Sequence, residues 1–355
     1  MKILYVSDAQ SVHTKRWAEH FRSQGREVHV ASFRPATIEG VTVHLLPSLG
    51  LGRVGYFLAV PTLRRLYRKI QPDVVHAQYV TSYGFLAALA GLKPLVITAW
   101  GSDVVVAPRR SRLMRLFAGY ALSKADAVTT VAEHMNSAVA ELGVPAGKVR
   151  AIPFGVDLLR FTPVNPLPSE ARPIRMISTR NFSPIYSVHT LIEAVHRVRR
   201  RGVPVSLDLV GEGPLRSSLE ALARDLGIEA LVTFHGHVDV SRLAELLRRS
   251  DVFISPALSD GNNVSLNEAM ASGVFPIATD IPANAQWIKH GEGGFLYAPG
   301  DVGQLAECLE KASADPALRE RAAKSNRKII ESRADWRACV EQMSQIYRSV
   351  MQKQV

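Results

Sequence analysis

The chain has 355 residues, of which 47% are hydrophobic and 21% charged, a composition typical of two ordinary globular cores and not of a disordered chain. Its two cysteines, Cys308 and Cys339, argue against a disulfide framework and against a thiolate metal site. Almost all of the net charge of +11 arises within residues 1–160, which indicates either an anionic partner (nucleic acid, acidic lipid or a phosphorylated substrate) or a solubilising surface.

The N-terminus, MKILYVSDAQ, has an apolar run too short for a signal peptide. No stretch approaches the ~20 apolar residues of a membrane span. We therefore expect a cytoplasmic protein.

The first half alternates β-rich runs with helical patterns. A strand at 2–7 precedes a helix at 13–25, and further strands are predicted at 27–32, 72–78, 94–100, 127–132 and 149–155. Near-continuous apolar strands between helices predict a parallel sheet covered on both faces.

Residues 153–173 contain five prolines and are interpreted as a linker. The alternation then restarts, with strands at 174–180, 205–211, 231–236, 251–256 and 274–280 and helices at 187–201, 214–226, 241–249 and 264–272. Doubly wound sheets bind ligands at the carboxyl ends of their strands, so two such halves predict a cleft between domains. A last helix, about 335–351, has an apolar stripe that needs a surface to pack on.

The stretch SDGNNVSLNEAMASG, residues 259–273, combines a helix start with two acids. The helix is expected to start near Asn263, with Asn or Ser as its cap. Free N–H groups at a helix start attract phosphate, and Gly261 lets the backbone approach a ligand. Asp260 before the turn and Glu268 just over one turn into the helix suit sugar hydroxyls. The order fits a sugar, a diphosphate and a ribose; an ordinary capped helix with two exposed acids fits the spacing equally well.

This stretch resembles the signature of the retaining GT-B glycosyltransferases of the "glycosyl transferases group 1" (family 4) type, with Asp260 in place of the first glutamate of Glu-x7-Glu. IPFGVDLLRFTP (152–163), LVGEGPLRSSLE (209–220) and VTFHGHV (232–238) match further motifs in the expected order. The resemblance implies an α/β GT-B fold, two Rossmann-like parallel-sheet domains facing across a cleft. Residues 1–165 with the C-terminal helix 336–355 would bind the acceptor, and residues 166–335 the donor.

The resemblance also implies roles for individual residues. Glu268 would bind the ribose, Asp260 the transferred sugar, and Arg180 the donor phosphates, since a guanidinium fork suits phosphate. The remaining donor-site residues would be Gly211 and Gly213 of the Gly-x-Gly turn, His237 and Val238 beside the base, Gly261, and the backbone amides of Asn262, Asn263, Val264 and Ser265 on the diphosphate.

The sequence departs from the family pattern at two positions. Tyr186 stands where a lysine usually follows the arginine, and Trp100 stands where a histidine is frequent. Asp8, His76 and Asp103 are candidates for orienting the acceptor, from their positions at strand ends. His235, His237 and Asp239 are spaced like metal ligands, but no third cluster joins them, so neither a metal nor another cofactor is expected.

The implied reaction moves a sugar from a nucleoside diphosphate to an acceptor hydroxyl with retention, in the synthesis of a polysaccharide, lipopolysaccharide or glycolipid. A sugar-nucleotide epimerase, a phosphorylase and a non-catalytic sugar-nucleotide binder are rival interpretations. Only the positive charge suggests nucleic-acid binding, and the sequence lacks the combination of aromatic and basic residues on which nucleic acids bind. Two basic amphipathic segments, 56–70 and 108–122, fit either an anionic membrane surface with a lipid-linked acceptor or core helices with a basic outer side.

Overall fold

A computed structural model describes residues 1–48, 55–163 and 172–352, which form two compact units. Unit 1 comprises Met1–Phe154 with Cys339–Val355, and unit 2 comprises Gly155–Ala338. The boundary expected at residue 165 lies outside the described residues. Val156 and Phe161 of the proline-rich segment are buried in the core of unit 2, so the first part of that segment belongs to this unit.

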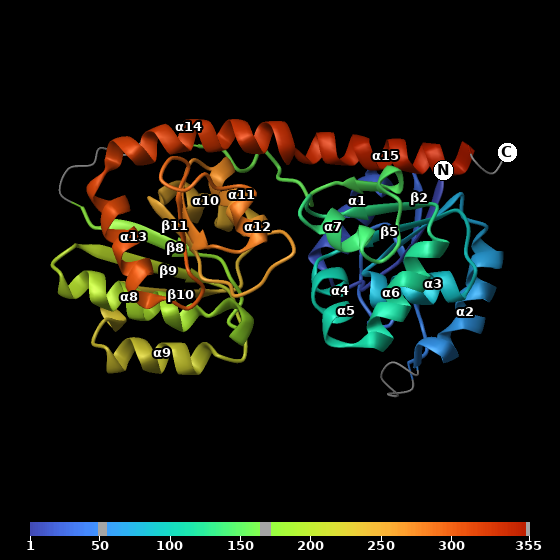
Figure 1. Ribbon diagram of the computed structural model, residues 1–355, viewed down its shortest axis with the longest axis horizontal. Helices are drawn as coiled ribbons and strands as arrows, with labels where there is room; N and C mark the ends of the chain where they lie inside the picture. Colours follow the sequence, from blue (N-terminus) through green and yellow to red (C-terminus); the bar gives the residue numbers. More distant parts are fainter. Residues whose placement is uncertain (49–54, 164–171, 353–355) are drawn as a thin grey trace. The chain divides into compact units, whose positions relative to one another are not determined.

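Unit 1 is built on a seven-stranded sheet in the order β3-β2-β1-β4-β5-β6-β7, in which every pairing is parallel. Figure 1 labels β2 and β5 of this sheet among its helices. Its strands are β1 (Lys2–Val6), β2 (Glu27–Ser32), β3 (Thr42–Leu45), β4 (Val74–Gln78), β5 (Leu95–Ala99), β6 (Ala127–Thr130) and β7 (Val149–Ala151). All residues of β4 and β5 are buried, as expected for central strands with helices on both faces.

The helices of unit 1 are α1 (Val12–Ser23), α2 (Gly55–Ile70), α3 (Phe85–Leu89), α4 (Ser102–Val105), α5 (Ala107–Arg110), α6 (Arg112–Lys124), α7 (Met135–Ala140) and, from Cys339 onwards, α15 (Trp336–Gln352). A π-helical turn, Val80–Gly84, precedes α3. The segment 108–122, which the sequence analysis treated as one amphipathic run, is broken at Ser111, because this residue is extended and its hydroxyl caps α6 by accepting from Met114 N.

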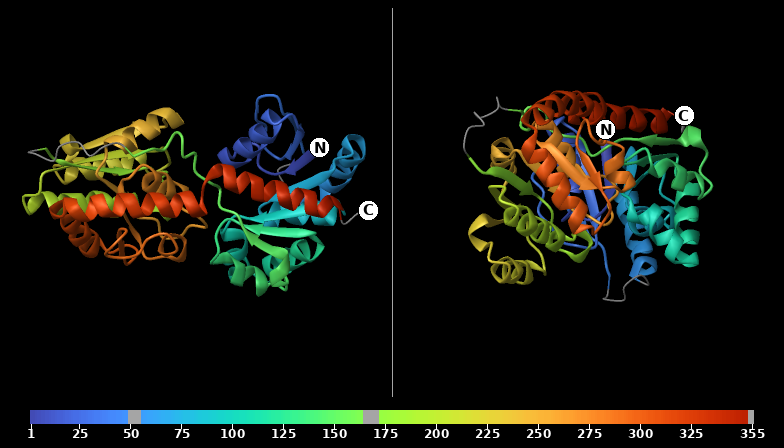
Figure 2. Two further views of the ribbon diagram at one scale, coloured as in Figure 1. Left: turned by 90° about the horizontal axis from the view of Figure 1, so that it is seen from above. Right: turned by 60° about the vertical axis from the view of Figure 1, so that its left-hand side comes forward.

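Helix α15 lies along unit 1 (Figure 2), and the apolar stripe seen in the sequence faces this unit. The buried residues of its stripe are Cys339, Val340, Met343, Ile346, Tyr347 and Val350. The Tyr347 ring contacts Phe21 of α1, and its hydroxyl lies 3.1 Å from that of Tyr5 on β1. The C-terminal helix therefore covers the same face of the sheet as α1.

Unit 2 is built on a six-stranded parallel sheet in the order β10-β9-β8-β11-β12-β13. Its strands are β8 (Ile174–Ser178), β9 (Val205–Val210), β10 (Val232–Gly236), β11 (Val252–Ser255), β12 (Phe275–Thr279) and β13 (Phe295–Tyr297). Its helices are α8 (Val188–Arg200), α9 (Arg216–Asp225), α10 (Val240–Arg249), α11 (Val264–Ala271), α12 (Pro282–Ala285), α13 (Val302–Ala314) and α14 (Pro316–Arg333).

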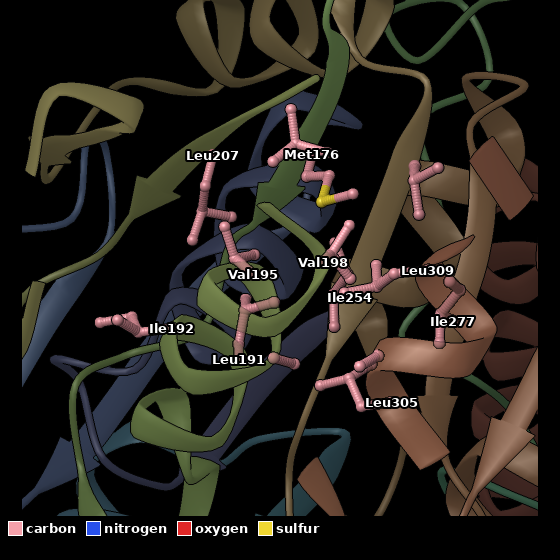
Figure 3. Packing of buried hydrophobic residues seen from close by; sticks show 14 of the residues in the cluster. Met176, Leu191, Ile192, Val195, Val198, Leu207, Ile254, Ile277, Leu305 and Leu309 are labelled. Carbon is pink, nitrogen blue, oxygen red and sulfur yellow. The ribbon is translucent and has the colours of Figure 1, made fainter. Parts of the chain in front are cut away.

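The sheet of unit 2 separates two apolar cores. Met176 and Ile254 face a cluster formed with α8, α9 and α13, whereas Ile177 and Phe253 face α10, α11 and α14, as the alternation along a strand requires. Figure 3 shows Leu191, Val195 and Val198 of α8 among the side chains of the first cluster. This packing fixes where β8 and β11 end, and hence where the loops that follow them begin.

The two parallel sheets confirm the α/β architecture that the alternation predicted. Both cysteines, Cys308 and Cys339, are buried. Among the described helices, none is long and apolar enough to cross a membrane.

Candidate functional site

Arg180, Asp260 and Asn263, three of the candidate donor residues of unit 2, lie where the strand order of its sheet reverses. Strands β8 and β11 are neighbours there, and the connections that leave them run in opposite directions. Arg180 follows β8 and Asp260 follows β11, so both stand at the carboxyl end of this pair. This is the place where open α/β sheets bind ligands.

Arg180 is the centre of the site. It is only 7% exposed, and its Nη2 lies 2.5 Å from Oδ2 of Asp260 while its Nη1 donates to Oδ1 of Asn263 at 2.8 Å. Its guanidinium carbon lies 4.2 Å from the ring centroid of Tyr186. Its Nε–H is buried without a partner among the described residues. Two side chains thus hold the guanidinium edge and one ring covers its face.

Asn263 connects this arginine to the start of α11. Its Oδ1 accepts from Leu266 N as the helix N-cap, and its Nδ2 donates to Ser255 Oγ at 2.8 Å and to Asn284 Oδ1 at 2.9 Å. The predicted cap at Asn263 is confirmed. Because the same oxygen also accepts from Arg180, one buried side chain fixes both the helix start and the cation.

The backbone N–H groups at the start of α11 differ in whether they already donate a hydrogen bond within the protein. Val264 N donates to the carbonyl of Asn262, so the turn itself uses this amide, which was expected on a diphosphate. Ser265 N has no acceptor among the described residues. The side chain of Asn262 accepts from Trp287 Nε1 at 3.2 Å, and its own Nδ2 is buried without a partner within the described chain. Polar groups that lack partners here suit a polar ligand.

The glycine turn after β9 packs closely against the loop after β8 that carries Arg180. A Cβ on Gly211 would lie 2.6 Å from the carbonyl oxygen of Arg180, and a Cβ on Gly213 would lie 2.5 Å from that of Phe182. Gly211 also has φ of +155°. Glycine is therefore required at both positions for close backbone packing beside the arginine, whatever else the turn binds.

Glu268 is a half-buried residue in the second turn of α11, and Ser265, one turn before it, directs its hydroxyl to the carbonyl of Thr179 at 3.4 Å. Gly261 is half-buried between Asp260 and Asn262. His237 and Val238 follow the edge strand β10, where His237 is exposed and Val238 half-buried.

Two acceptor candidates of unit 1, His76 and Asp103, are buried. His76 is 1% exposed in the middle of β4, with Nδ1 2.6 Å from Tyr347 Oη and Nε2 2.6 Å from Thr98 Oγ1. Burial lowers the pKa of His76 to about 3. The buried imidazole links the sheet to α15 through Tyr347.

Asp103 is fully buried, and its carboxylate accepts from the backbone N–H groups of Val80, Trp100 and Gly101 at 2.7–3.2 Å. Burial raises the pKa of Asp103 against the lowering effect of these bonds. Its geometry is that of a residue that shapes two loops at the carboxyl ends of β4 and β5. Asp8 alone of the three candidates is partly open to solvent, with Arg34 Nη1 at 3.4 Å.

The loops that Asp103 shapes carry aromatic side chains. Trp100 packs edge-on against Tyr79, His13 and Phe154, and the rings of His13 and Phe154 stack at 3.7 Å. Tyr79 has φ of +75°, a backbone conformation that is unfavourable for a residue other than glycine. Such strain is concentrated at functional sites. Of this cluster only Trp100 carries a signal in the sequence, because the members are far apart in the chain.

His235 and His237 do not combine into a metal site. His235 Nε2 contacts Asp208 Oδ1 at 2.7 Å. Within residues 1–48, 55–163 and 172–352, no group of three or more His, Cys, Asp or Glu side chains is arranged to hold a metal ion.

Two family models match the chain and together cover most of it: "Glycosyl transferase 4-like" over residues 2–132 and "Glycosyl transferases group 1" over residues 164–329. The chain is 26% identical to a glycogen synthase of Mycobacterium tuberculosis, over 79% of its own length and 69% of the relative's.

It is also 28% identical to a GDP-mannose-dependent α-(1-6)-phosphatidylinositol monomannoside mannosyltransferase of the same organism, over 64% of this chain and 63% of that one. Among solved structures, Anabaena HepE in complex with UDP superposes with a TM-score of 0.81 at 20% identity, over 98% of this chain and 100% of that chain. The similarity to HepE establishes a shared GT-B fold.

Proposed function

The chain belongs to the group 1 glycosyltransferases, and on that premise we propose that it transfers a sugar from a nucleoside diphosphate to an acceptor hydroxyl. In this proposal the transfer retains the configuration of the anomeric carbon. It serves the synthesis of a cell-surface polysaccharide, lipopolysaccharide or glycolipid. The observation that carries the proposal is the contact of Arg180 with Asp260 and with Asn263, the cap of α11. Arg180, Asp260 and the start of α11 are in contact where the strand order of the sheet reverses.

The proposed donor lies across this constellation. Arg180 and the positive end of α11 bind the diphosphate, since a guanidinium and free amides stabilise negative charge in a preorganised way. Glu268, in the second turn of the helix, accepts from the ribose hydroxyls, and Asp260 accepts from hydroxyls of the transferred sugar. Gly211 and Gly213 let the turn after β9 pack closely beside Arg180. His237 and Val238 border the base of the nucleotide.

The proposed chemistry needs no protein nucleophile. The bond between the anomeric carbon and the diphosphate oxygen breaks, the acceptor oxygen bonds to the same face of that carbon, and its proton passes to the departing phosphate. Arg180 and the α11 amides stabilise the charge that develops on the leaving group, so we expect transfer to proceed without a metal or another cofactor.

The proposed acceptor is a glycan or a lipid-linked glycan bound by unit 1. Asp8 follows β1, the loop with Tyr79 follows β4, and the loop with Trp100 follows β5. The strand order of this sheet also reverses, between β1 and β4. Asp103 positions these loops. We therefore assign acceptor recognition to the carboxyl ends of these three strands.

Unit 1 also presents a surface suited to an anionic membrane. Phe85 of α3 contacts Phe57 of α2 and Tyr120 of α6, which brings these helices together (Figure 1). Leu113 and Leu116 of α6 are 52% and 69% exposed. The basic side chains of α2, α5 and α6 are Arg64, Arg65, Arg68, Lys69, Arg109, Arg110, Arg112, Arg115 and Lys124. Apolar side chains among cations favour peripheral binding to the cytoplasmic face of a membrane.

A ligand that binds only the folded chain raises its melting temperature. UDP is the first probe because the HepE neighbour was crystallised with it, and GDP and ADP are tested beside it. We expect one of the three to raise the melting temperature and Glu268→Ala to abolish the shift. Glu292→Ala, at an exposed acid of the same unit paired with Lys289, is the matched control and keeps the shift. A shift that survives Glu268→Ala contradicts the assignment of the ribose, and no shift with any of the three contradicts donor binding.

Membrane binding is tested by flotation with vesicles that contain phosphatidylglycerol, against vesicles of phosphatidylcholine alone. We expect flotation only with the anionic lipid, with loss in Leu113→Ser/Leu116→Ser and in high salt. Failure to float with anionic vesicles removes the membrane part of the proposal and leaves the transferase part intact.

A further inference from the structure

We propose that Tyr186 is a positioning residue of the donor site, whose ring holds the Arg180 guanidinium in place for the donor phosphates. The proposal rests on the proposed function and deepens it. Tyr186 is half-buried, and its ring centroid lies 4.2 Å from the guanidinium carbon. A guanidinium over an aromatic face is attracted by the negative face of the ring, and it can stack there while its N–H groups remain available at its edge.

The turn that presents this ring is fixed to the rest of the site. Tyr186 ends a short helical turn, Pro184–Tyr186, between β8 and α8. The carbonyl of Ile185 in this turn accepts from Leu258 N at 2.8 Å, in the segment that leads to Asp260. The ring over the arginine and the acid beside it are therefore carried by two loops that are bonded to each other.

The residue after Tyr186 has an unfavourable backbone conformation. Ser187 has φ of +46° and ψ of +39°, in the left-handed region that favours glycine. It is 2% exposed, and its hydroxyl bonds to that of Thr190 at 2.8 Å. A strained residue persists where its surroundings determine its conformation, and here the strain turns the chain so that Tyr186 covers Arg180 before α8 begins.

The role of the ring follows from the partners of the arginine. Asp260 is proposed to bind hydroxyls of the donor sugar, yet it contacts Arg180 Nη2. When Asp260 turns to the sugar, the guanidinium loses one of its two side-chain acceptors. Tyr186 on its face and Asn263 on Nη1 then hold it for the phosphates. An aromatic ring is suited to this task because it attracts the cation without neutralising its charge.

The test measures the dissociation constants of UDP, GDP and ADP, and of the matching monophosphates, for Tyr186→Phe, Tyr186→Leu and Tyr186→Ala. Ile185→Ala is the matched control, since this exposed neighbour in the same turn presents its side chain to solvent. We expect Phe to bind the preferred diphosphate within about twofold of the unmodified chain, because it keeps the aromatic face. Leu and Ala weaken diphosphate binding about 5- to 30-fold, the span of a partly to fully desolvated cation–π contact.

Comparing monophosphate with diphosphate binding distinguishes positioning of Arg180 by the Tyr186 ring from a general contribution of Tyr186 to the stability of the fold. We expect the Leu and Ala variants to lower the preference for diphosphate over monophosphate, while Ile185→Ala leaves both constants unchanged. Should Tyr186→Ala not fold, the comparison of Leu with Phe decides. Leu binding as tightly as Phe, or Phe binding as weakly as Ala, overturns the proposal. If the unmodified chain binds none of the three diphosphates, the proposed function fails first, which distinguishes the two failures.

Discussion

Asp260 and Arg180 are each other's partners: Oδ2 of the acid lies 2.5 Å from Nη2 of the arginine, and the two side chains are 16% and 8% exposed. The resemblance assigned the acid to the transferred sugar and the arginine to the phosphates. Their contact means that each group is already paired before it meets the group for which it is proposed. On the proposed assignment, binding of the donor involves an exchange of partners and not a simple addition of contacts.

This exchange predicts opposite effects of Asp260→Asn on binding and on transfer. The amide removes the negative charge that offsets Arg180, so we expect a nucleoside diphosphate to bind as tightly as before or up to about tenfold more tightly, a gain of about 1.4 kcal/mol. The same change removes a charged acceptor for sugar hydroxyls, and we expect the rate of transfer to fall about 100-fold. Calorimetry with UDP, GDP and ADP and a transfer assay measure the two effects.

A parallel loss of binding and transfer in Asp260→Asn would contradict the exchange. Arg180→Ala is the complementary variant. It leaves Asp260 and Asn263 without their shared donor, so we expect weaker diphosphate binding together with a loss of stability of about 2–4 kcal/mol.

Asn263→Ala should destabilise unit 2 more than the loss of an ordinary cap. Removing a cap costs about 1 kcal/mol, and this change also leaves Arg180 Nη1 and Asn284 Oδ1 without the partner they have in the site. We expect a total of about 2–4 kcal/mol in chemical denaturation. Asp239→Ala is the control, because Asp239 caps α10 and is exposed. Equal costs for the two variants would show that Asn263 acts only as a cap.

The pH dependence of stability should carry the signature of His76. Its pKa lies near 6.5 in an unfolded chain and at about 3 in the fold, where burial beside Tyr347 keeps the ring neutral. Below pH 6.5 the unfolded chain binds a proton that the folded chain does not bind. The fold therefore loses up to about 1.4 kcal/mol per pH unit as the pH falls from about 6.5 towards 3, and loses nothing further on this account below that pH.

His76→Asn removes this titration, so its denaturation curves between pH 4.5 and 7 should depend less on pH, by close to one proton. His189→Asn, at an exposed histidine, is the control and keeps the original dependence. An unchanged slope in His76→Asn would mean that another group is responsible.

Asp103→Ala should separate the functions of the two units. The carboxylate holds the loops that carry Tyr79 and Trp100 through three backbone N–H groups. Without it we expect transfer to fall at least 100-fold, because the acceptor loops lose their conformation. Binding of the nucleoside diphosphate, assigned wholly to unit 2, should change less than twofold. A matching loss of nucleotide binding, in a variant that calorimetry shows to be folded, would refute the assignment of Asp103 to acceptor loops alone.

Much of the fold could be predicted from local patterns. Continuous apolar strands between helices indicated parallel sheets, and the start of α11 at Asn263 followed from the residue types there. The contact between Arg180 and Asp260 spans 80 positions, and that between His76 and Tyr347 spans 271. Strand-end position alone suggested His76 for the acceptor, and no local signal showed that a C-terminal helix would bury it. Asn284, a partner of Asn263, carried no signal at all.

The resemblance to the glycosyltransferase family gave the expected roles of individual site residues, which local patterns did not, but it misses what a departing residue does. It identified Tyr186 only as a departure, a missing cation, whereas the geometry shows its ring on the arginine that remains. A substitution that looks like a loss in a motif can therefore be a different solution to the same electrostatic task.

The most direct test of the donor site is a crystal structure of the chain with UDP, GDP or ADP, whichever binds. We expect the diphosphate within hydrogen-bond distance of the Arg180 guanidinium and of the Ser265 amide, with the ribose hydroxyls on Glu268. A diphosphate bound elsewhere on the chain, with Arg180 still paired to Asp260 and no ligand atom beside Ser265, would contradict it.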